Sequence, residues 1–273
     1  MWAPALTRLY AVVEVLVIAW LYMPRDVAGF TITTMTCEPS NAADSRQTRS
    51  VWFADGREPL IANVRKNQMG TIPTLETERL LLRPFCQSDA AEVTRLAGDR
   101  SVAATTSNIP HPYNESMACE WIERHQPTFE KDEGVAFAIT LKADGSLVGA
   151  ISLMGMVKGH RAELGYWIGK PYWGLGYCTE AAREVLEYAF GVLRLSRVHA
   201  SHFARNPASG RVMQKVGMRS EGCCRQHIQK WGQLEDLEIY GILEQEWRDI
   251  ANQAMQRTRD KIGPDGKSEV ASR

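Results

Sequence analysis

One segment of the chain, Ala162 to Phe190, constrains the fold more than any other. It opens with an apolar run that reads as a strand, Ala162 to Gly169, and passes through a glycine-containing turn, Tyr172 to Tyr177. From about Thr179 it continues as a helix. Apolar side chains recur in that helix at helical spacing, which predicts a face buried against a core. A strand, a tight turn and a packed helix in this order predict a fold that mixes strands and helices.

The glycine turn lies directly before the predicted helix start, where backbone N–H groups are free and the helix dipole is positive. Glycines at 174 and 176 would let the phosphates of a ligand come close to that backbone. Gly174 to Thr179 is therefore a candidate cradle for a pyrophosphate. The alternative is a tight turn that needs its glycines only for its own geometry. The sequence contains no P-loop, and the turn lacks the third glycine of a dinucleotide fingerprint.

Apolar segments on both sides of this unit predict a largely antiparallel sheet. Leu80 to Leu82 begins a strand that Pro84 ends. Asp89 with Glu92 three residues later indicates a capped helix start. Asp144-Gly145 between two apolar runs is a strong hairpin signal. The remaining predictions are strands at 135–141, 146–156, 197–203, 221–230 and 235–243, and helices at 115–125 and 206–217.

The charge of the chain is balanced, with 32 basic and 32 acidic residues. This balance predicts no electrostatic attraction to nucleic acid or to an anionic membrane. Hydrophobic residues make up 44% and charged residues 23%, which is an ordinary globular mixture. The six cysteines include no CxxC pair and do not resemble a disulfide framework. We therefore expect reduced thiols, a cytoplasmic protein and no metal site.

The chain divides into three parts by composition. Residues 1–70 are predicted to be an N-terminal extension, with an apolar segment, Leu9 to Met23, followed by a polar stretch that we expect to be disordered. That segment is shorter than the ~20 residues of a spanning helix and contains Glu14, so membrane contact is expected only if residues 9–23 act as an anchor. Residues 74–249 form the predicted domain, and residues 250–273 a polar tail that frays. We expect the residues before Met69 to be dispensable, and a native start at Met69 is one explanation.

Several ordered motifs extend the argument beyond the glycine turn. Trp173 to Ala181 reads W-G-L-G-Y-C-T-E-A, Leu75 to Pro84 reads L-E-T-E-R-L-L-L-R-P, and Ala162 to Trp167 reads A-E-L-G-Y-W. Further matches follow in order: Asn206, Ser209, Lys215, Gly217, Met218, Glu221, Gly222, Arg225, Asp236 and Tyr240. Together they resemble the GNAT superfamily of N-acetyltransferases, and within it the branch that acetylates the N-terminal alanine or serine of ribosomal proteins.

The resemblance implies an α/β (α+β) fold with a mixed, mostly antiparallel sheet of six to seven strands, flanked by helices. The fourth and fifth strands of that sheet would splay apart, with acetyl-CoA lying between them as co-substrate. Main-chain groups near Trp167 and Ile168 would hold the pantetheine and polarise the thioester carbonyl, and Asn206 is a candidate for the pantetheine. The resemblance assigns the pyrophosphate to the loop residues Gly174, Leu175, Gly176, Tyr177, Cys178 and Thr179.

The resemblance also implies direct attack by an amine in a ternary complex, without a metal. Glu163 is the candidate base, acting through water, and the alternative is a structural carboxylate paired with an arginine. Ser209 would hydrogen-bond or protonate the departing thiolate, or else only contact the cofactor. His199 and His202 are predicted on opposite faces of their strand, where one could approach the cleft.

Two loop residues depart from the family pattern. Cys178 stands where alanine or glycine is usual, and Leu175 where lysine, arginine or glutamine is usual. Both departures predict modest affinity for acetyl-CoA.

The acceptor implied by the branch is a protein N-terminal α-amino group. A small-molecule amine of the aminoglycoside or polyamine type is an alternative, and so is a catalytically weak module that only binds acyl-CoA. We expect no nucleic-acid partner, and a monomer or a homodimer. The segments that would set the acceptor, 108–129 and 225–234, carry no pattern from which its chemistry could be inferred.

Overall fold

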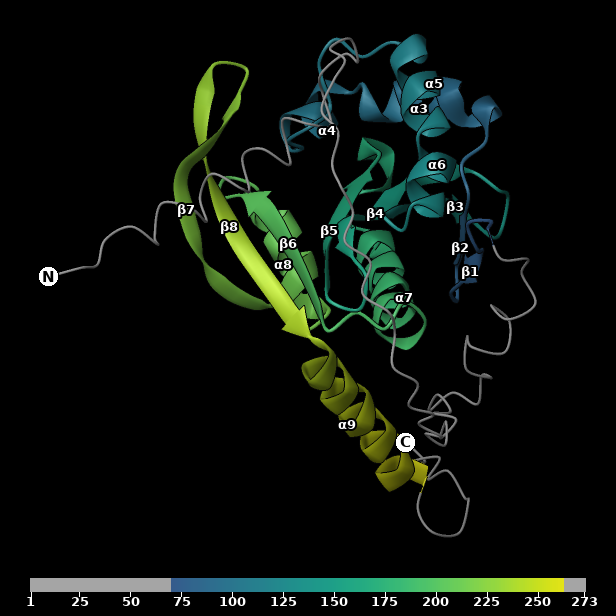
Figure 1. Ribbon diagram of the computed structural model, residues 1–273, viewed down its shortest axis with the longest axis vertical. Coiled ribbons are helices and arrows are strands. Elements are labelled where there is room, and N and C mark those ends of the chain that lie inside the picture. Colours follow the sequence, from purple (N-terminus) through teal and green to yellow (C-terminus); the bar gives the residue numbers. More distant parts are fainter. Residues whose placement is uncertain (1–69, 263–273) are drawn as a thin grey trace, which may run out of the picture. The chain divides into compact units, whose positions relative to one another are not determined.

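The strands form one sheet in the order β1-β2-β3-β4-β5-β6-β8-β7 (Figure 1). The computed structural model describes residues 70–262. Every neighbouring pair of strands is antiparallel except β5 and β6, which are parallel. The strands are β1 (Leu75–Glu76), β2 (Leu80–Arg83), β3 (Val135–Leu141), β4 (Leu147–Val157), β5 (Arg161–Ile168), β6 (Arg197–Phe203), β7 (Arg219–Lys230) and β8 (Gln233–Leu243).

The mixed, mostly antiparallel sheet expected from the sequence is confirmed, with one strand more than predicted. The additional strand is β1, in which Leu75 and Glu76 pair with Leu82 and Leu81 of β2. Two residues are too few to show an alternating pattern, so the periodicity could not reveal this strand. The expected splay is also present. β5 and β6 pair only from Arg161 to Glu163, and beyond that point each strand bonds on its other side alone.

Helices cover both faces of the sheet. They are η1 (Gln87–Asp89), α3 (Ala90–Ala97), α4 (Arg100–Ala104), α5 (Glu115–Glu123), α6 (His125–Glu130), η2 (Lys170–Tyr172), α7 (Tyr177–Gly191), α8 (Pro207–Lys215) and α9 (Glu244–Ile262). The larger core joins one face of the sheet to α7 and α8, and the smaller core joins the other face to α3 and α5.

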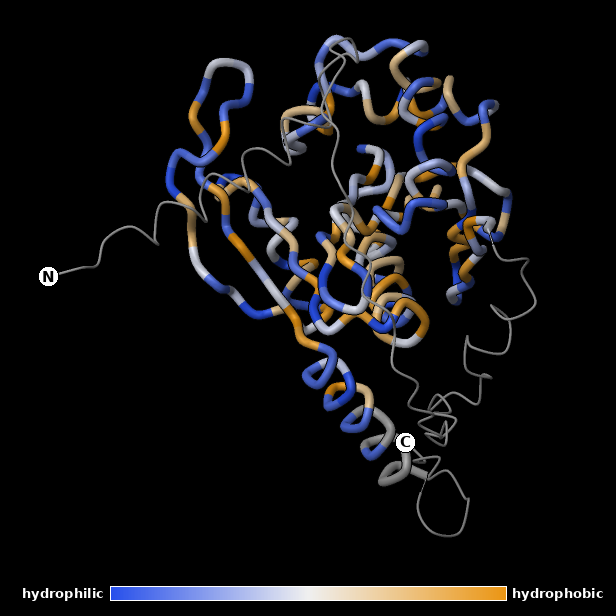
Figure 2. The backbone as a smooth tube through the Cα atoms, viewed as in Figure 1, coloured by the Kyte–Doolittle hydropathy of each residue, from blue (hydrophilic) through white to orange (hydrophobic). Residues whose placement is uncertain are grey.

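Strand β3 contributes side chains to both cores. Phe137 and Ile139 belong to the larger core, whereas Ala138 between them belongs to the smaller one. Successive side chains of a strand point to opposite faces, so a strand buried on both sides is apolar throughout. Figure 2 shows the hydrophobic stretches gathered in the sheet and α7, while α9 is mainly hydrophilic.

The helix start at residue 90 agrees with the prediction, but the Asp89 side chain does not cap that helix as expected. The Asp89 carboxylate accepts two hydrogen bonds from Arg83, at 2.7 and 2.8 Å, and a third from the Cys86 backbone N–H at 2.9 Å. It therefore caps the short η1 turn before α3, and Glu92 pairs with Arg95 instead. A charged partner on β2, which no local pattern reveals, decides where this carboxylate points.

Other helix limits also differ from the sequence predictions. Helix α7 starts at Tyr177 rather than Thr179, and the helix expected to run to His125 breaks into α5 and α6. Helix α4 was not predicted. Helix α9 continues to Ile262, past the domain limit expected at residue 249. The expectations for residues 1–69, including Leu9 to Met23, and for 263–273 lie outside the described residues. Within the described range, no helix has the length and apolar character needed to cross a membrane.

Candidate functional site

The point where β5 and β6 separate organises the candidate site. The last paired residues are Glu163 of β5 and His199 of β6. Side chains alternate along both strands, so Glu163 and Trp167 share one face, and Tyr166 points to the face covered by α7 and α8. The buried Trp167 packs in the smaller core. The two faces of the split therefore carry different groups, which can serve different parts of a reaction.

The glycine turn has the backbone that an anion site requires. Gly174 and Gly176 have left-handed φ angles of 78° and 84°. A Cβ added at Gly174 would meet nothing within 4 Å, so the space above the turn is open. Gly176 is the N-cap of α7, and no side chain caps this helix start. The free N–H groups of the first helical turn and the positive end of the dipole fit a pyrophosphate.

Three residues from two distant motifs hold the turn in place. The Glu180 carboxylate in the first turn of α7 accepts hydrogen bonds from Thr77 Oγ1 at 2.6 Å and from the Arg79 backbone N–H at 2.8 Å. The Arg79 guanidinium binds the other carboxylate oxygen at 2.7 Å. Burial raises the pKa of Glu180, but these hydrogen bonds more than offset the effect and leave the pKa below its ordinary value.

Arg79 also reaches the glycine turn itself. Its Nη1 donates to the Leu175 carbonyl at 3.1 Å, and its guanidinium lies 4.7 Å from the centre of the Tyr177 ring. Arg79 therefore brings a positive charge to the turn at which Leu175 lacks the usual basic side chain. Sequence reasoning missed this role. The motifs that contain Arg79 and Glu180 were both recognised, but nothing local connects residues about a hundred positions apart.

One main-chain group at the end of β5 is already hydrogen-bonded to a side chain. The Ile168 carbonyl accepts a hydrogen bond of 2.6 Å from the indole N–H of Trp173, a side chain that the sequence assigned only to the turn. The Trp173 ring itself is about half exposed. This contact joins the end of β5 to the glycine turn, the two segments that would hold the pantetheine and the pyrophosphate.

Cys178 lies in the first turn of α7 and is only partly exposed. Burial raises the pKa of Cys178 well above the ordinary value of a thiol. The side chain is therefore neutral and adds no negative charge beside the candidate phosphate site.

Ser209 lies in the first turn of α8 and contacts Tyr166. The two hydroxyl oxygens are 2.9 Å apart, and the Tyr166 hydroxyl also lies 3.1 Å from the Ser209 carbonyl oxygen, to which it can donate. Asn206 is the N-cap of α8, but its side chain makes no capping hydrogen bond. Asn206 and Ser209 thus both lie at the start of α8, and Ser209 contacts β5 beside the split.

Glu163 lies half-exposed on the opposite face, where Ser201 Oγ donates to its Oε1 at 3.2 Å. Within the part of the chain that the structure describes, Glu163 forms no ion pair with an arginine. Its neighbour across the strand pair is His199. Burial lowers the pKa of His199, and the nearby Glu163 carboxylate opposes that shift only in part. The histidine is therefore neutral near pH 7.

His202 faces the other way, so the prediction of opposite faces for the two histidines is confirmed. It is buried under α8, stacked on Tyr240 at 5.6 Å between ring centres. Its Nε2 lies where a side chain at Gly210 would begin. His199 is thus the histidine that shares a face with the candidate base.

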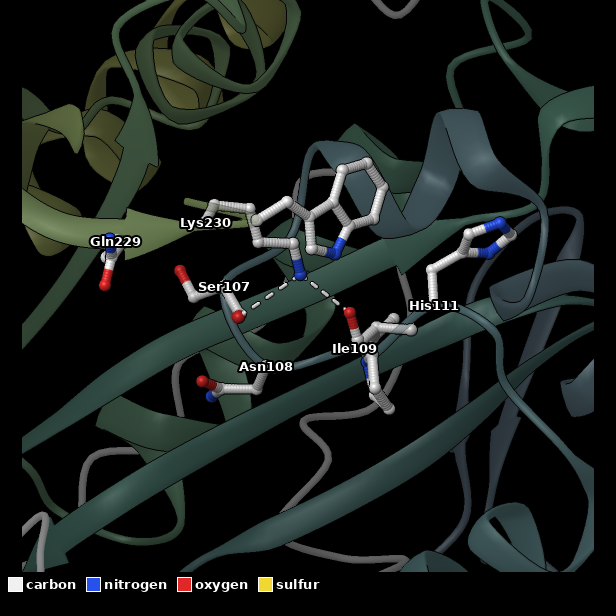
Figure 3. A pocket seen from close by; sticks show the side chains of 8 residues that line it. Ser107, Asn108, Ile109, His111, Gln229 and Lys230 are labelled. Carbon is white, nitrogen blue, oxygen red and sulfur yellow. Dashed lines mark hydrogen bonds between the residues drawn. The ribbon is translucent and has the colours of Figure 1, made fainter. Parts of the chain in front are cut away.

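A pocket of about 340 Å³ lies at the tip of the β7–β8 hairpin (Figure 3). The Lys230 side chain is part of its lining, and Nζ donates to the carbonyl oxygens of Ser107 and Ile109, at 3.4 and 2.7 Å. The Trp231 ring forms one wall, with cations near it from Lys230 and Arg100. The lining is Ser107, Asn108, Ile109, Pro110, His111, Gln229, Lys230 and Trp231. Apart from Ser107, these residues come from the two segments, 108–129 and 225–234, whose sequence carried no recognisable pattern.

Thiols and possible metal ligands are dispersed in the described range. The five cysteines there, Cys86, Cys119, Cys178, Cys223 and Cys224, are free. No three histidine, cysteine, aspartate or glutamate side chains among the described residues come together as a metal site would require.

Comparison with known proteins connects this geometry to a family. The sequence profile of the acetyltransferase (GNAT) domain matches residues 79–219. The N-acetyltransferase YoaA of Bacillus subtilis, itself uncharacterised, is 30% identical over 172 residues, which are 63% of this chain and 97% of YoaA. YdaF of the same organism, named as a candidate ribosomal N-acetyltransferase, is 34% identical over 136 residues, 50% of this chain and 71% of YdaF. A GNAT acetyltransferase structure from Bacillus anthracis superimposes with a TM-score of 0.57 at 28% identity, covering 63% of this chain and 99% of that one.

Proposed function

The chain belongs to the GNAT acetyltransferase family, and from that premise we propose that it acetylates the N-terminal α-amino group of a protein. It is an acetyl-CoA-dependent N-acetyltransferase, and the relatives that it resembles are named as N-acetyltransferases. The observation that carries the proposal is the open face of the β5–β6 split. Glu163 lies there beside Ser201 and a neutral His199, and none of the described residues forms an ion pair with it.

Binding of acetyl-CoA is assigned to the end of β5, the glycine turn and the start of α8. Residues 174–179 would receive the pyrophosphate on free N–H groups, with Arg79 adding positive charge. Main-chain groups near Trp167 and Ile168, together with Asn206, would hold the pantetheine. The open space above Gly174 supports this assignment, because a side chain there would fill it. Acetyl-CoA supplies the activated acetyl group, and the protein orients it and polarises its carbonyl.

Glu163 would act as the base. If the thioester lies near Trp167, then Glu163 is four residues away along the strand, about 13 Å, so it works through water. A carboxylate acting through water is a mild base. An α-amino group, with a pKa near ~8, needs less help to become neutral than a lysine-type amine near ~10.4. This difference favours a protein N-terminus over a polyamine.

Ser209 would stabilise the sulfur as it departs. Its hydroxyl lies at the start of α8, where the positive end of the helix dipole favours developing negative charge. No covalent enzyme intermediate is needed, because the neutral amine attacks the carbonyl carbon directly. The reaction then takes place in a ternary complex, and we expect it in the cytoplasm, where acetyl-CoA is available.

The likeness to YdaF supports a ribosomal protein as acceptor, since that relative is named for such an activity. The experiment is an acceptor screen with purified protein and acetyl-CoA, following thiol release and product mass. Peptides with free N-terminal alanine or serine should be acetylated, whereas the same peptides with blocked N-termini should not. An aminoglycoside and a polyamine complete the panel.

Each outcome of this screen discriminates among the functions under consideration. Turnover of the small amines alone would replace the proposed acceptor. Binding of acetyl-CoA by calorimetry without thiol release from any amine would identify a module that binds acyl-CoA and has lost its chemistry.

A further inference from the structure

The hydroxyl group of Tyr166 lies where β5, α7 and α8 meet. It is the tyrosine of the A-E-L-G-Y-W strand, and its side chain points to the face opposite Glu163. Its hydrogen-bonding partners both belong to Ser209, whose hydroxyl lies at 2.9 Å and whose carbonyl oxygen at 3.1 Å. Tyr166 therefore connects the strand beside the split to the helix start that carries the candidate leaving-group residue.

The surroundings of Tyr166 fix its protonation state. Burial raises the pKa of Tyr166 far above its ordinary value, the adjacent Cys178 adds to that effect, and the hydrogen bond with Ser209 opposes it only weakly. The phenol thus carries its proton throughout the working pH range. A group that always keeps its proton is a dependable hydrogen-bond donor and never a competing base.

We propose that Tyr166 is a positioning residue that turns the Ser209 hydroxyl proton toward the departing sulfur. This inference rests on the function proposed above for Ser209. A serine hydroxyl has one proton, which can point either to the Tyr166 oxygen or to another acceptor. Tyr166 likewise has two acceptors within reach, the carbonyl and the hydroxyl oxygen of Ser209. The pair can therefore reverse its hydrogen bond without breaking contact.

The reversal fits the charge that develops in the reaction. As the amine nitrogen bonds to the carbonyl carbon, the carbon–sulfur bond breaks and its electron pair leaves with the sulfur. Ser209 then donates to the sulfur, and Tyr166 donates to the Ser209 oxygen. No proton is transferred along this chain; the proton lost by the amine passes through water toward Glu163. Two aligned donors stabilise a thiolate more than one donor does.

A merely structural tie between β5 and α8 would use the same hydroxyl but affect different quantities. In that case, loss of the Tyr166 hydroxyl would lower thermal stability, or it would displace α8 and thereby lower the affinity for acetyl-CoA. The rate of the chemical step would stay constant. The two interpretations therefore separate in single-turnover kinetics.

The test compares the full chain with Tyr166→Phe, Ser209→Ala and the double variant, using the acceptor found in the screen. Tyr166→Phe should lower the single-turnover rate of acetyl transfer about 10-fold, the loss expected for one hydrogen bond, with the Kd of acetyl-CoA unchanged. Ser209→Ala should cost roughly 100-fold. Because Tyr166 acts through Ser209, the double variant should be no slower than Ser209→Ala.

The matched control is Tyr188→Phe, which removes another buried tyrosine hydroxyl, on α7 and packed against Phe137. Its single-turnover rate should equal that of the parent protein. An unchanged rate in Tyr166→Phe would overturn the inference, and so would losses that multiply in the double variant or an unaffected Ser209→Ala. Absence of acetyl transfer by the parent protein would instead refute the proposed function, so the two failures are distinguishable.

Discussion

His125 begins α6 with its ring against those of Trp121 and Phe85, at centroid distances of 4.4 and 5.2 Å. It is 9% exposed, and neither ring nitrogen has a hydrogen-bond partner among residues 70–262. Burial lowers the pKa of His125 from 6.5 to about 4. The folded protein therefore keeps this ring neutral at a pH where the unfolded chain protonates it.

This difference predicts an acid-sensitive fold. Between pH 6.5 and about 4 the unfolded chain binds the extra proton, so stability falls as the pH drops through that range. The full loss is about 3 kcal/mol. His125→Phe keeps an aromatic ring and should remove most of this dependence, measured by urea unfolding at pH 7 and pH 4.5. The exposed His227→Gln should leave the dependence intact, and a parallel decline in all three proteins would assign it to other groups.

The residue scale also shows what alternation along a strand can predict. It placed Glu163 and Trp167 on one face, and His199 and His202 on opposite faces, because the period of a strand depends on sequence alone. It could not connect Tyr166 with Ser209 or Glu163 with Ser201, since those contacts depend on how separate elements pack. The capping interpretation of Asp89 was wrong for the same reason: its partner, Arg83, belongs to another element.

Among the elements, α7 and the turn before it make the most direct prediction about the cofactor. Gly176 has a left-handed φ angle, and a Cβ added there would lie 3.4 Å from Arg79 Nη2, so a valine would crowd the N–H groups and the guanidinium proposed to receive the phosphates. Gly176→Val should therefore abolish measurable binding of acetyl-CoA in calorimetry. Gly145 in the β3–β4 hairpin has a similar φ of 75° and open space around it. Gly145→Val imposes the same backbone strain and should leave acetyl-CoA binding unchanged. Equal affinities in the two folded variants would remove the turn from the cofactor site.

Arg79 gives the second prediction at this scale. Its guanidinium is exposed enough for solvent to screen the ion pair with Glu180, so we expect little change in stability from its loss. The turn, however, would lose both its anchor at the Leu175 carbonyl and its nearby positive charge. Arg79→Ala should weaken acetyl-CoA binding roughly 30-fold, since a hydrogen bond and a nearby charge each contribute about 1 kcal/mol. Arg248→Ala, which removes the surface pair with Glu244 on α9, should have no effect on binding. An unchanged affinity of Arg79→Ala for acetyl-CoA would show that the Arg79 side chain has only a structural role.

Secondary structure was predicted accurately from the sequence where a segment was long enough to show its hydrophobic periodicity. Strands β3 and β6 begin and end as predicted, whereas the two-residue β1 and the short helices α4 and α6 give no periodic pattern. Helix α9 continues beyond the expected boundary with a mainly hydrophilic sequence, so its apolar pattern gave little indication of where it would end.

At the scale of the whole described molecule, hydrogen bonds connect the β7–β8 hairpin and the residue after β6 to the end of α4 and the segment that follows it. Arg205, just after β6, pairs with Glu235 of β8 and donates to the Ala104 carbonyl at 2.7 Å. Lys230 makes the second tie through the carbonyls of Ser107 and Ile109. No local pattern could predict contacts between residues more than a hundred positions apart. The sequence could therefore propose residues for the cofactor side of the site, but it indicated nothing about the side where the acceptor is expected.

Lys230 offers a way to test whether the hairpin tip serves the acceptor. Its side chain is buried, and burial lowers the pKa of Lys230, with the charge of Arg205 adding to the shift. Lys230→Met fills similar space without the ammonium group, so the hairpin loses its two hydrogen bonds to the 107–109 segment. We expect the KM for the peptide acceptor to rise about 10-fold, the effect of losing a charged hydrogen bond, while the Kd of acetyl-CoA is unchanged. Lys158→Met, at an exposed lysine on the β4–β5 turn that pairs with Asp132, is the control and should change neither constant. If Lys230→Met instead lowers the affinity for acetyl-CoA and leaves the acceptor KM unchanged, the hairpin supports the cofactor side, and the acceptor must approach the Glu163 face by a route that avoids this pocket.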